Sequence, residues 1–213
     1  DAAAELKMTI AQLVNLAKYN MLDGSNRHAL DDLAANHGIV IPADTSYDIY
    51  KVITDVIHDS KEMRNLIDFV DMIWFIYAHK ITVETFDRVV ADEIQDFNPL
   101  QQHIVKLMMG KSGLFIGVGD DRQSIYGFAG ADVYSIRNMQ ETMHKHGGIV
   151  VMPLNQTRRC PISVVNYAKS MVADFDAMPD AIQGSIERIY TDKAIELMNP
   201  TDMGLCRTNA PLV

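Results

Sequence analysis

Several features that mark exported, membrane-embedded or metal-binding proteins are scarce in this sequence. The two cysteines, Cys160 and Cys206, have no metal-ligand spacing, so we expect neither a zinc site nor a disulfide. The longest apolar run, Met72 to Ala78, is far too short to span a bilayer. No charged, apolar and small-residue signal opens the chain. Together these absences predict a soluble protein of the cytoplasm, with reduced thiols and no membrane partner.

Basic residues are also scarce. The chain has 19 lysines and arginines against 28 aspartates and glutamates, a net charge of −9, and acidic residues are in excess in 1–80, 81–145 and 146–213 alike. Broad binding of nucleic acid needs clustered Lys and Arg facing the phosphates. Any contact with nucleic acid must therefore be local. The 48% hydrophobic content over 213 residues supports one substantial core, or a core with a smaller satellite domain.

The first part of the chain has helical spacing throughout. Apolar residues recur every three or four positions in two stripes, which are Leu6, Ile10, Leu13, Val14 and Ala17, and then Met63, Leu66, Ile67, Val70, Ile73, Trp74 and Tyr77. Neither stripe has the alternation of a strand. We therefore predict an all-α segment over residues 1–80.

After Lys80 short apolar runs alternate with helical patterns. The predicted strands are Arg88–Ala91, Leu114–Val118 and Ile149–Met152, each followed by a polar turn. Three helices are predicted, with Asn98 to Gly110 framing the first, residues 132–146 forming the second, and the third starting at Pro161 and turning Val164, Val165, Ala168, Met171 and Val172 inward. This alternation is typical of a parallel sheet wound with helices, so the predicted fold class is α/β.

Two of the predicted strands end in polar residues. The stretches are "VVADEIQD", with Asp92 and Glu93, and "LFIGVGDDRQSIYGFAGAD", with Asp120 and Gln123. In open parallel sheets, ligands bind beyond the carboxyl ends of the strands. Carboxylates there suit Mg²⁺ and the activation of water in phosphoryl transfer, and an amide can orient a phosphate or water. One such turn alone is more simply a polar cap on a strand, whereas two together favour a site.

Longer stretches resemble a known family. "VVADEIQDFNPLQ" resembles the DExx box, or Walker B motif, of UvrD/Rep-like superfamily 1 DNA helicases. "GVGDDRQSIYGFAGAD" resembles their third motif and "LNQTRRCPISVVNYA" their fourth, while "LCRTNAPLV" and "LIDFVDMIWF" resemble flanking segments. The matches occur in family order from about Leu66 to Val213. The resemblance implies a RecA-like P-loop NTPase core with a helical insertion subdomain at 1–80, the second half of the first RecA-like domain at 81–147, and the start of the second at 148–213.

The resemblance also implies roles for single residues in the ATPase centre. Asp92 would hold Mg²⁺, and Glu93 would act as the general base for the attacking water and contact Mg²⁺ through water. Gln95 and Asp96 would couple that site to the DNA-facing motif. Asp120 would also lie at the nucleotide.

Three further sets of roles follow from the third and fourth motifs. Gln123 is similar to the glutamine that senses the γ-phosphate, and Arg159 to the fourth-motif arginine that contacts it, for which a planar fork of donors is suited. Tyr126 and Phe128 would contact or stack on single-stranded bases. The alternative for these two aromatics is simple packing beneath a loop.

The sequence also departs from the family pattern. Ala129 stands where the family usually has arginine, and no GxxxxGK[ST] loop to cradle phosphates occurs in the sequence. The late motifs with the second domain's arginine finger are also absent. We therefore expect an internal fragment of a longer helicase, which does not hydrolyse ATP by itself. Its sheet would be incomplete, with exposed strand edges open to self-association.

The resemblance implies an ATP-dependent DNA helicase or translocase as the intact protein. It would couple Mg²⁺–ATP hydrolysis to movement on single-stranded DNA and to unwinding at duplex junctions, in the 3′ to 5′ direction. Two alternatives stay open. One is a non-catalytic interaction module derived from a helicase, favoured by the missing loop and Ala129. The other is a motor subunit of a nuclease or recombination complex.

Overall fold

The chain forms two compact units, residues 1–149 and 150–213. A computed structural model describes residues 2–42, 48–63, 65–124, 130–132 and 134–205. Each unit is considered by itself. In the described part of the chain, no helix is both long enough and apolar enough to cross a membrane.

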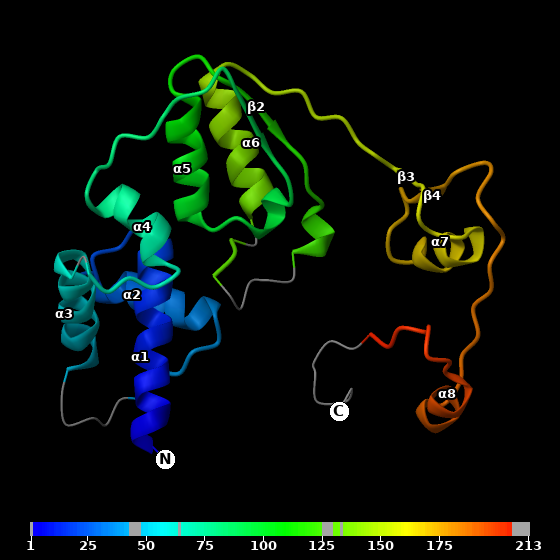
Figure 1. The fold of residues 1–213 in the computed structure, drawn as a ribbon, viewed down its shortest axis with the longest axis horizontal. Helices are drawn as coiled ribbons and strands as arrows, with labels where there is room; N and C mark the ends of the chain where they lie inside the picture. The colour runs from blue at the N-terminus through cyan, green and yellow to red at the C-terminus, as the bar shows by residue number, and fades with distance from the viewer. Residues whose placement is uncertain (1, 43–47, 64, 125–129, 133, 206–213) are drawn as a thin grey trace. The chain divides into compact units, whose positions relative to one another are not determined.

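The first half of unit 1 is helical, as the sequence predicts. The helices among its described residues are α1 (Ala2–Tyr19), α2 (Arg27–Asn36), α3 (Ile49–Glu62) and α4 (Asp71–Ala78) (Figure 1). The predicted stripe on α1 is confirmed, because Leu13, Val14 and Ala17 are buried in the core that these helices share. Leu100 of a later helix belongs to the same core. The helical half and the strand-containing half of unit 1 therefore pack on common residues.

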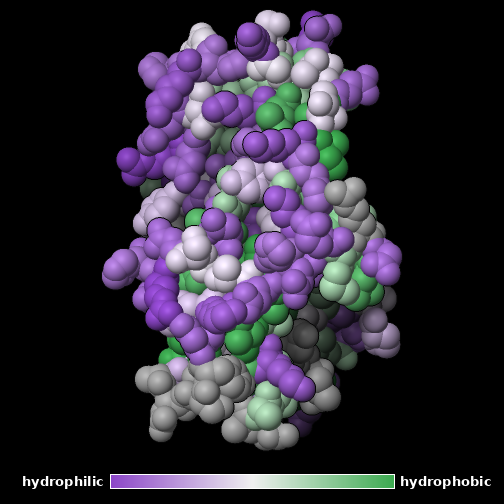
Figure 2. Space-filling model, turned by 90° about the vertical axis from the view of Figure 1, so that its left-hand side faces the viewer, coloured by the Kyte–Doolittle hydropathy of each residue, from purple (hydrophilic) through white to green (hydrophobic). Residues whose placement is uncertain are grey.

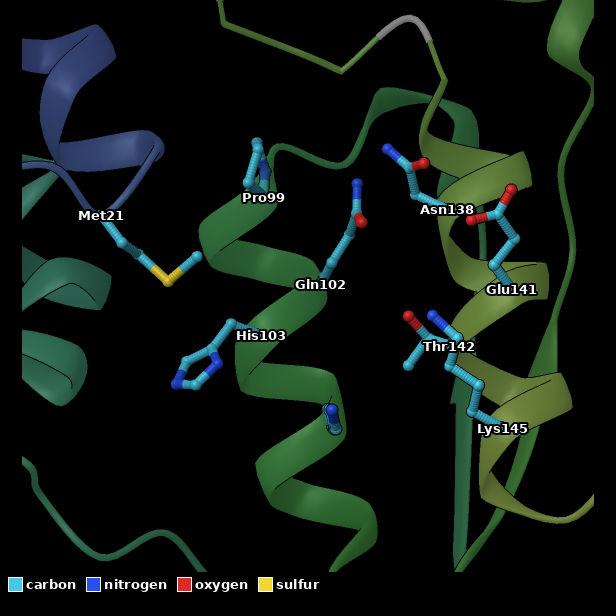
Figure 3. A pocket seen from close by; sticks show the side chains of 9 residues that line it. Met21, Pro99, Gln102, His103, Asn138, Glu141, Thr142 and Lys145 are labelled. Carbon is cyan, nitrogen blue, oxygen red and sulfur yellow. The ribbon is translucent and has the colours of Figure 1, made fainter. Parts of the chain in front are cut away.

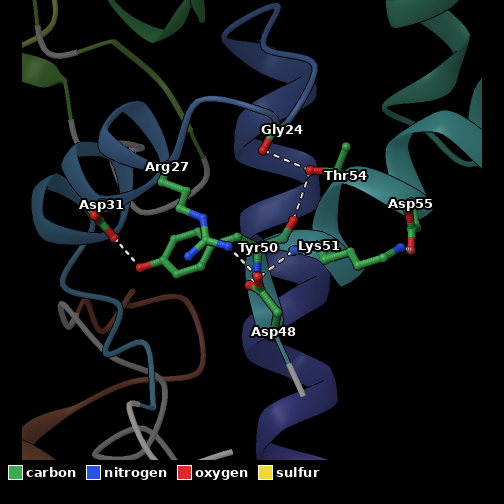
Figure 4. Close-up of polar contacts among 8 residues, drawn as sticks. All are labelled: Gly24, Arg27, Asp31, Asp48, Tyr50, Lys51, Thr54 and Asp55. Atoms are coloured by element: carbon green, nitrogen blue, oxygen red, sulfur yellow. Dashed lines mark hydrogen bonds and ion pairs between the residues drawn. The ribbon is translucent and has the colours of Figure 1, made fainter.

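Polar contacts fix the ends of α2 and α3 (Figure 4). The Asp48 carboxylate accepts from the backbone N–H groups of Tyr50 and Lys51 and so caps α3. Arg27 at the start of α2 donates to the same carboxylate and lies over the Tyr50 ring. Thr54 Oγ1 donates to the carbonyl of Gly24, which has φ +82°. These contacts hold the α1–α2 connection against α3.

A buried ion pair joins α1 to α4. Lys18 Nζ lies 2.6 Å from Asp71 Oδ1, and the two side chains are only 2% and 6% exposed. The ammonium group also lies 5.0 Å from the centre of the Trp74 ring. Removing one partner would leave the other charge buried and unpaired, so this pair ties the two helices together.

The second stripe predicted for residues 63–77 is wrong at its beginning. Only Asp71–Ala78 is helical, and Met63, Leu66 and Ile67 are 46%, 68% and 55% exposed. The helix starts where Asp68 and Asp71 each accept a hydrogen bond from the other's backbone N–H. This reciprocal cap sets the start of α4 later than the apolar spacing suggests.

The second half of unit 1 is a two-stranded parallel sheet with helices on one face (Figure 1). Its elements are β1 (Arg88–Ala91), the 3₁₀ turn η1 (Ile94–Asp96), α5 (Pro99–Met109), β2 (Leu114–Gly117), the 3₁₀ turn η2 (Asp121–Gln123) and α6 (Ser135–His146). Arg88 pairs with Leu114 and Ala91 with Gly117. Val89 packs with Val105 and Met139 in a second core between the sheet and α5 and α6. The predicted mixed helix–strand class with parallel pairing is confirmed.

The predicted limits of these elements are mostly confirmed. The α5 helix has Asn98 as N-cap in a full capping box with Gln101, Pro99 at its first position, and Gly110 as C-cap. The second predicted helix is right at its end, where Gly147 caps α6, but starts three residues later than predicted. The opposite face of the sheet carries exposed apolar side chains, with Val90 68% exposed and Ile116 45% exposed.

Unit 2 differs more from the sequence prediction. Its elements are β3 (Gln156–Thr157), α7 (Ile162–Ala168), β4 (Asp176–Ala177), parallel to β3, and α8 (Thr191–Leu197). The strand predicted at Ile149–Met152 is wrong, because this segment pairs with no described strand and Val150 and Met152 are 82% and 80% exposed. Met171 is also exposed rather than inward. Val165 is the one buried apolar residue among those described in unit 2.

The face drawn in Figure 2 is largely hydrophilic, although the helical half also exposes large apolar side chains such as Val40 and Phe69, at 81% and 90%. Hydrophilic residues dominate the face in Figure 2, with smaller hydrophobic areas between them. This distribution fits amphipathic helices that turn their apolar sides to the core described above.

Candidate active site

The ends of β1 and β2 lie at the same edge of the sheet. The two strands are parallel and in register up to Ala91 and Gly117, so the chain leaves both at one place. The backbone N–H of Val118 donates to the Ala91 carbonyl at 2.9 Å, and the N–H of Ile94 donates to the Val118 carbonyl at 3.0 Å. The two polar turns singled out in the sequence are thus side by side.

The Gln95 side chain joins the two turns. It is 3% exposed, its Nε2 donates to Glu93 Oε2 at 2.6 Å, and its Oε1 accepts from the backbone N–H of Asp120 at 3.1 Å. Ser124 Oγ donates to the Gln95 carbonyl at 3.3 Å. One buried amide therefore orients a carboxylate of the first turn and the backbone of the second.

Gly119 leaves the space that this amide occupies. A Cβ at position 119 would lie 2.5 Å from Gln95 Oε1 and 3.0 Å from Ile94 Cγ1. Distances of that kind are shorter than van der Waals contact, so a side chain at 119 would displace the amide. The glycine after Val118 is required by the close approach of the two turns.

Glu93 has an unusual backbone conformation. Its φ of 52° and ψ of 41° are left-handed, a region that non-glycine residues adopt at some cost. Its N–H donates to Asp92 Oδ1 at 2.9 Å, and both carboxylates are exposed to solvent. Strain of this kind is frequent at functional sites, since a backbone that is held there fixes the direction of a side chain.

In the second turn, Asp120 accepts two hydrogen bonds. Asp120 Oδ2 accepts from Gln123 Nε2 at 2.8 Å, and Oδ1 accepts from the N–H of Arg122 at 3.0 Å. Gln123 is exposed, so its amide is held by the turn and remains accessible. Asp120 therefore positions the side chain that was predicted to sense a phosphate.

Asp96 faces the interior side of the first turn. Burial raises the pKa of Asp96 above its usual range, and the negative charge of Glu93 adds a smaller effect in the same direction. Its buried Oδ1 has no hydrogen-bond partner among the described residues. A carboxyl group in this setting holds its proton more strongly than an ordinary aspartate.

The start of α6 is bonded to the same turn. Ser135 Oγ is buried, donates to the Ile94 carbonyl at 2.6 Å and accepts from Gln102 Nε2 at 3.2 Å. The Asp132 N–H donates to the Phe97 carbonyl at 3.2 Å. The chain that follows the second turn thus returns to the first turn. Sequence reasoning did not find Ser135 or Gln102, because neither lies in a recognisable motif.

The structure brings together most of the predicted site residues. Those that lie on the two adjacent turns are Asp92, Glu93, Gln95, Asp96, Asp120 and Gln123. Tyr126, Phe128 and Ala129 lie outside the described residues. Arg159 belongs to unit 2, is exposed, and donates its backbone N–H to Thr157 Oγ1 at 3.2 Å.

The donor set at the first turn fits Mg²⁺ held jointly with a substrate. No group of three or more His, Cys, Asp or Glu side chains among the described residues is placed to hold a metal ion. Mg²⁺ commonly binds through one or two carboxylates, with water and substrate phosphates as its other ligands. Asp92, exposed and with one carboxylate oxygen bonded only to its neighbour's N–H, can supply such a ligand.

Comparison with known proteins identifies the family. The family model described as "UvrD/REP helicase N-terminal domain" matches residues 2–144, a range that includes both polar turns. The chain belongs to the UvrD/REP helicase family. This agrees with the family that the motifs resemble.

Among relatives of this UvrD/REP family member are two proteins named DNA helicase II. The one from Haemophilus influenzae is 27% identical over 130 residues, 57% of this chain and 17% of the relative. The one from Escherichia coli is 29% identical over 121 residues, 52% of this chain and 16% of the relative. A third relative, from Oenococcus oeni, is named as a subunit of an ATP-dependent helicase/nuclease. It is 30% identical over 134 residues, which cover 60% of this chain and 11% of the relative. The chain spans less than a fifth of the length of each.

Proposed function

We propose that residues 88–124 form half of the ATPase centre of a DNA helicase. The observation that carries this proposal is the Gln95 side chain, which links Glu93 to the backbone of Asp120. A polar cap on a strand needs no such link between two turns. The link suits a centre in which groups on adjacent strands must act on one ligand.

In the proposed reaction, Glu93 is the general base. Its Oε2 is held by Gln95, and no hydrogen bond to its Oε1 occurs among the described residues, so Oε1 can accept the proton of an attacking water. Asp92 would hold Mg²⁺, which when bound neutralises charge on the transferring phosphoryl group. Gln123, held by Asp120, would orient the water or the γ-phosphate.

The remaining family roles are proposals on the same basis. Arg159 would contact the γ-phosphate, and Tyr126 and Phe128 would contact bases of single-stranded DNA. The fold would be the RecA-like P-loop core, with residues 81–147 in the first such domain and 148–213 beginning the second. Residues 1–80 would be the helical insertion.

For the whole protein we propose a cytoplasmic, ATP-dependent translocase on single-stranded DNA. It would unwind duplex junctions, in the 3′ to 5′ direction by resemblance to the family. The membership of the chain in the UvrD/REP helicase family supports this proposal. Hydrolysis would require a GxxxxGK[ST] loop, which the 213 residues do not contain.

A second candidate is the motor component of a nuclease complex. It is favoured by the relatives whose names describe an ATP-dependent helicase/nuclease, including one from Enterococcus faecalis that is 27% identical over 91% of this chain and 19% of its own length. A nuclease domain in the same reading frame would favour this candidate. A reading frame that encodes neither a nuclease domain nor a phosphate-binding loop would favour the non-catalytic interaction module.

Self-association of the chain is proposed from the β1–β2 sheet. Each of the two strands pairs only with the other among the described residues, and Val90, Leu114, Ile116 and Val118 are exposed on or beside them. Unpaired strand edges beside apolar side chains favour pairing with another chain. Sedimentation at rising concentration would show dimers or larger species, and a monomer at all concentrations would contradict the proposal.

The test of the proposed function is ATP hydrolysis by the protein encoded in the complete reading frame, with and without single-stranded DNA. We expect DNA to stimulate hydrolysis and Glu93→Gln to remove about 99% of it or more, because general bases contribute about 10²-fold to 10⁴-fold. Glu84→Gln, which neutralises an exposed carboxylate ahead of β1, is the matched control. Equal rates for Glu93→Gln and wild type would show that Glu93 is not the base.

A further inference from the structure

A hollow of about 360 Å³ lies on unit 1 and is lined by none of the site residues of the two polar turns. It runs across α5, with Met21 and His103 on one side and side chains of α6 on the other (Figure 3). Its walls are Met21, Pro99, Gln102, His103, Lys106, Asn138, Glu141, Thr142 and Lys145. Polar side chains and apolar surface both contribute to this lining, so the hollow can offer hydrogen bonds and charge to a ligand.

The two ends of the hollow differ in charge. At one end Gln102 and Asn138 both donate to Asp132 Oδ2, at 3.0 and 2.6 Å, and Glu141 pairs with Arg137 at 3.2 Å. The acids and amides of that end are thus already engaged with each other.

The other end carries two lysines from different helices. Lys106 comes from α5 and Lys145 from α6, and neither forms an ion pair with a described residue. Thr142, whose hydroxyl can donate or accept, lines the same hollow. Figure 3 shows Thr142 and Lys145 directed from α6 toward α5. Two lysines and a hydroxyl from two helices thus line one hollow, and neither lysine has an acidic partner among the described residues.

The charge of Lys106 also acts on His103, which lies one turn earlier on the same helix. Burial, and next the charge of Lys106, lower the pKa of His103 below its usual range. A neutral imidazole keeps one N–H that can donate a hydrogen bond. The simpler explanation for the lysines is that each lies in the last turn of its helix, where a cation offsets the helix dipole. That explanation does not account for their meeting at one hollow.

We propose that Lys106, Thr142 and Lys145, which all line this hollow, bind a phosphate group. Lysine binds phosphate as a point charge, and a hydroxyl adds a directional hydrogen bond. We infer that this phosphate group belongs to the backbone of single-stranded DNA, and this part of the proposal rests on the proposed helicase function. In a chain with net charge −9, contact with nucleic acid must be local, and two lysines with no acidic partner supply such a contact.

The test combines inorganic phosphate with a labelled oligo-dT strand, both added to the 213-residue chain. The variant is Lys106→Gln with Lys145→Gln, and the matched control is Lys7→Gln with Lys61→Gln on α1 and α3. We expect phosphate to shift the amide resonances of Lys106, Thr142 and Lys145 saturably in wild type and control, and not in the variant. Affinity for oligo-dT should fall about tenfold in the variant, with a salt dependence shallower by about 0.7.

The other possible results separate the phosphate site from its assignment to DNA. If phosphate shifts no resonance of this end saturably, the site is refuted. If phosphate shifts them but oligo-dT affinity is equal in variant and control, the site takes free phosphate or a nucleotide and the DNA source is refuted. If wild type binds no oligo-dT, the proposed DNA function fails, while the phosphate titration still decides the site. Thr142→Val, which removes only the hydroxyl, should weaken phosphate binding with both lysines present.

Discussion

At the scale of the residue, Gln95 and Gly119 explain why two ordinary polar turns form one site. The buried amide reaches both turns only because position 119 has no side chain. The DExx resemblance indicated that Gln95 couples the site, but the physical means of coupling was not visible in the sequence. The contact between Gln95 and Asp120, 25 positions apart, depends on strand register, which the sequence alone does not specify.

Gly119→Ala is expected to lower stability by about 1–2 kcal/mol, since displacing Gln95 breaks buried hydrogen bonds. Urea unfolding of the chain measures this change. In a Gln95→Ala background the same substitution should cost much less, because the methyl group then meets no amide. An undiminished cost in that background would show that Gly119 acts through its own backbone and not through Gln95.

His103 predicts a pH dependence of stability. An unfolded histidine takes up its proton near about pH 6.5, whereas burial and Lys106 delay protonation in the folded chain to lower pH. The unfolded state therefore binds more protons just below about pH 6.5, and stability falls as the pH falls through that range. His103→Gln should reduce the loss of unfolding free energy between about pH 7 and 5. Equal losses in variant and wild type would contradict the assignment.

At the scale of the element, local signals decided what the sequence could predict. The limits of α5 follow from Asn98, Pro99 and Gly110, whose roles are set by neighbours in the chain. The strands β1 and β2 were predictable as short apolar runs before polar turns. Ile149–Met152 has the same appearance, but no described strand lies beside it to pair with. Pairing is a tertiary property, so an apolar run alone overpredicts strands.

Ser135 shows how the elements are joined around the site. Its hydroxyl donates to the Ile94 carbonyl and accepts from Gln102, with the side chain buried. We expect Ser135→Ala to lower the unfolding free energy by about 1–3 kcal/mol, because a buried carbonyl loses its donor. Ser60→Ala is the control, since Ser60 makes only a solvent-exposed hydrogen bond within its own helix and should change stability by about 0.5 kcal/mol or less. Equal effects of the two substitutions would contradict the role given to Ser135.

At the scale of the whole molecule, the two units differ in how much they bury. Every buried apolar residue of the described chain except Val165 lies in unit 1. Unit 1 thus contains the core and the two polar turns, and sequence reasoning anticipated its helix–strand order but not the core shared by both halves. A shared core depends on which helix and sheet faces pack against each other, and the periodicity of apolar residues in the sequence does not specify this packing.

A chain ending at Ile149 is therefore expected to keep the stability of unit 1 within about 1 kcal/mol. Trp74, the single tryptophan and a core residue of unit 1, reports its unfolding by fluorescence. The urea transition followed at Trp74 should coincide in the shortened and full chains. A large shift of its midpoint would show that unit 2 contributes to the core transition.

We propose that Glu93 acts on the attacking water and not on the binding of the nucleotide. The most direct test is to measure, for Glu93→Gln in the protein of the complete reading frame, both the dissociation constant of Mg²⁺–ATP and the single-turnover rate of its hydrolysis. We expect a dissociation constant within about twofold of wild type and a rate lower by about 10²-fold to 10⁴-fold. An unchanged rate, or a loss that lies entirely in binding, would contradict this proposal.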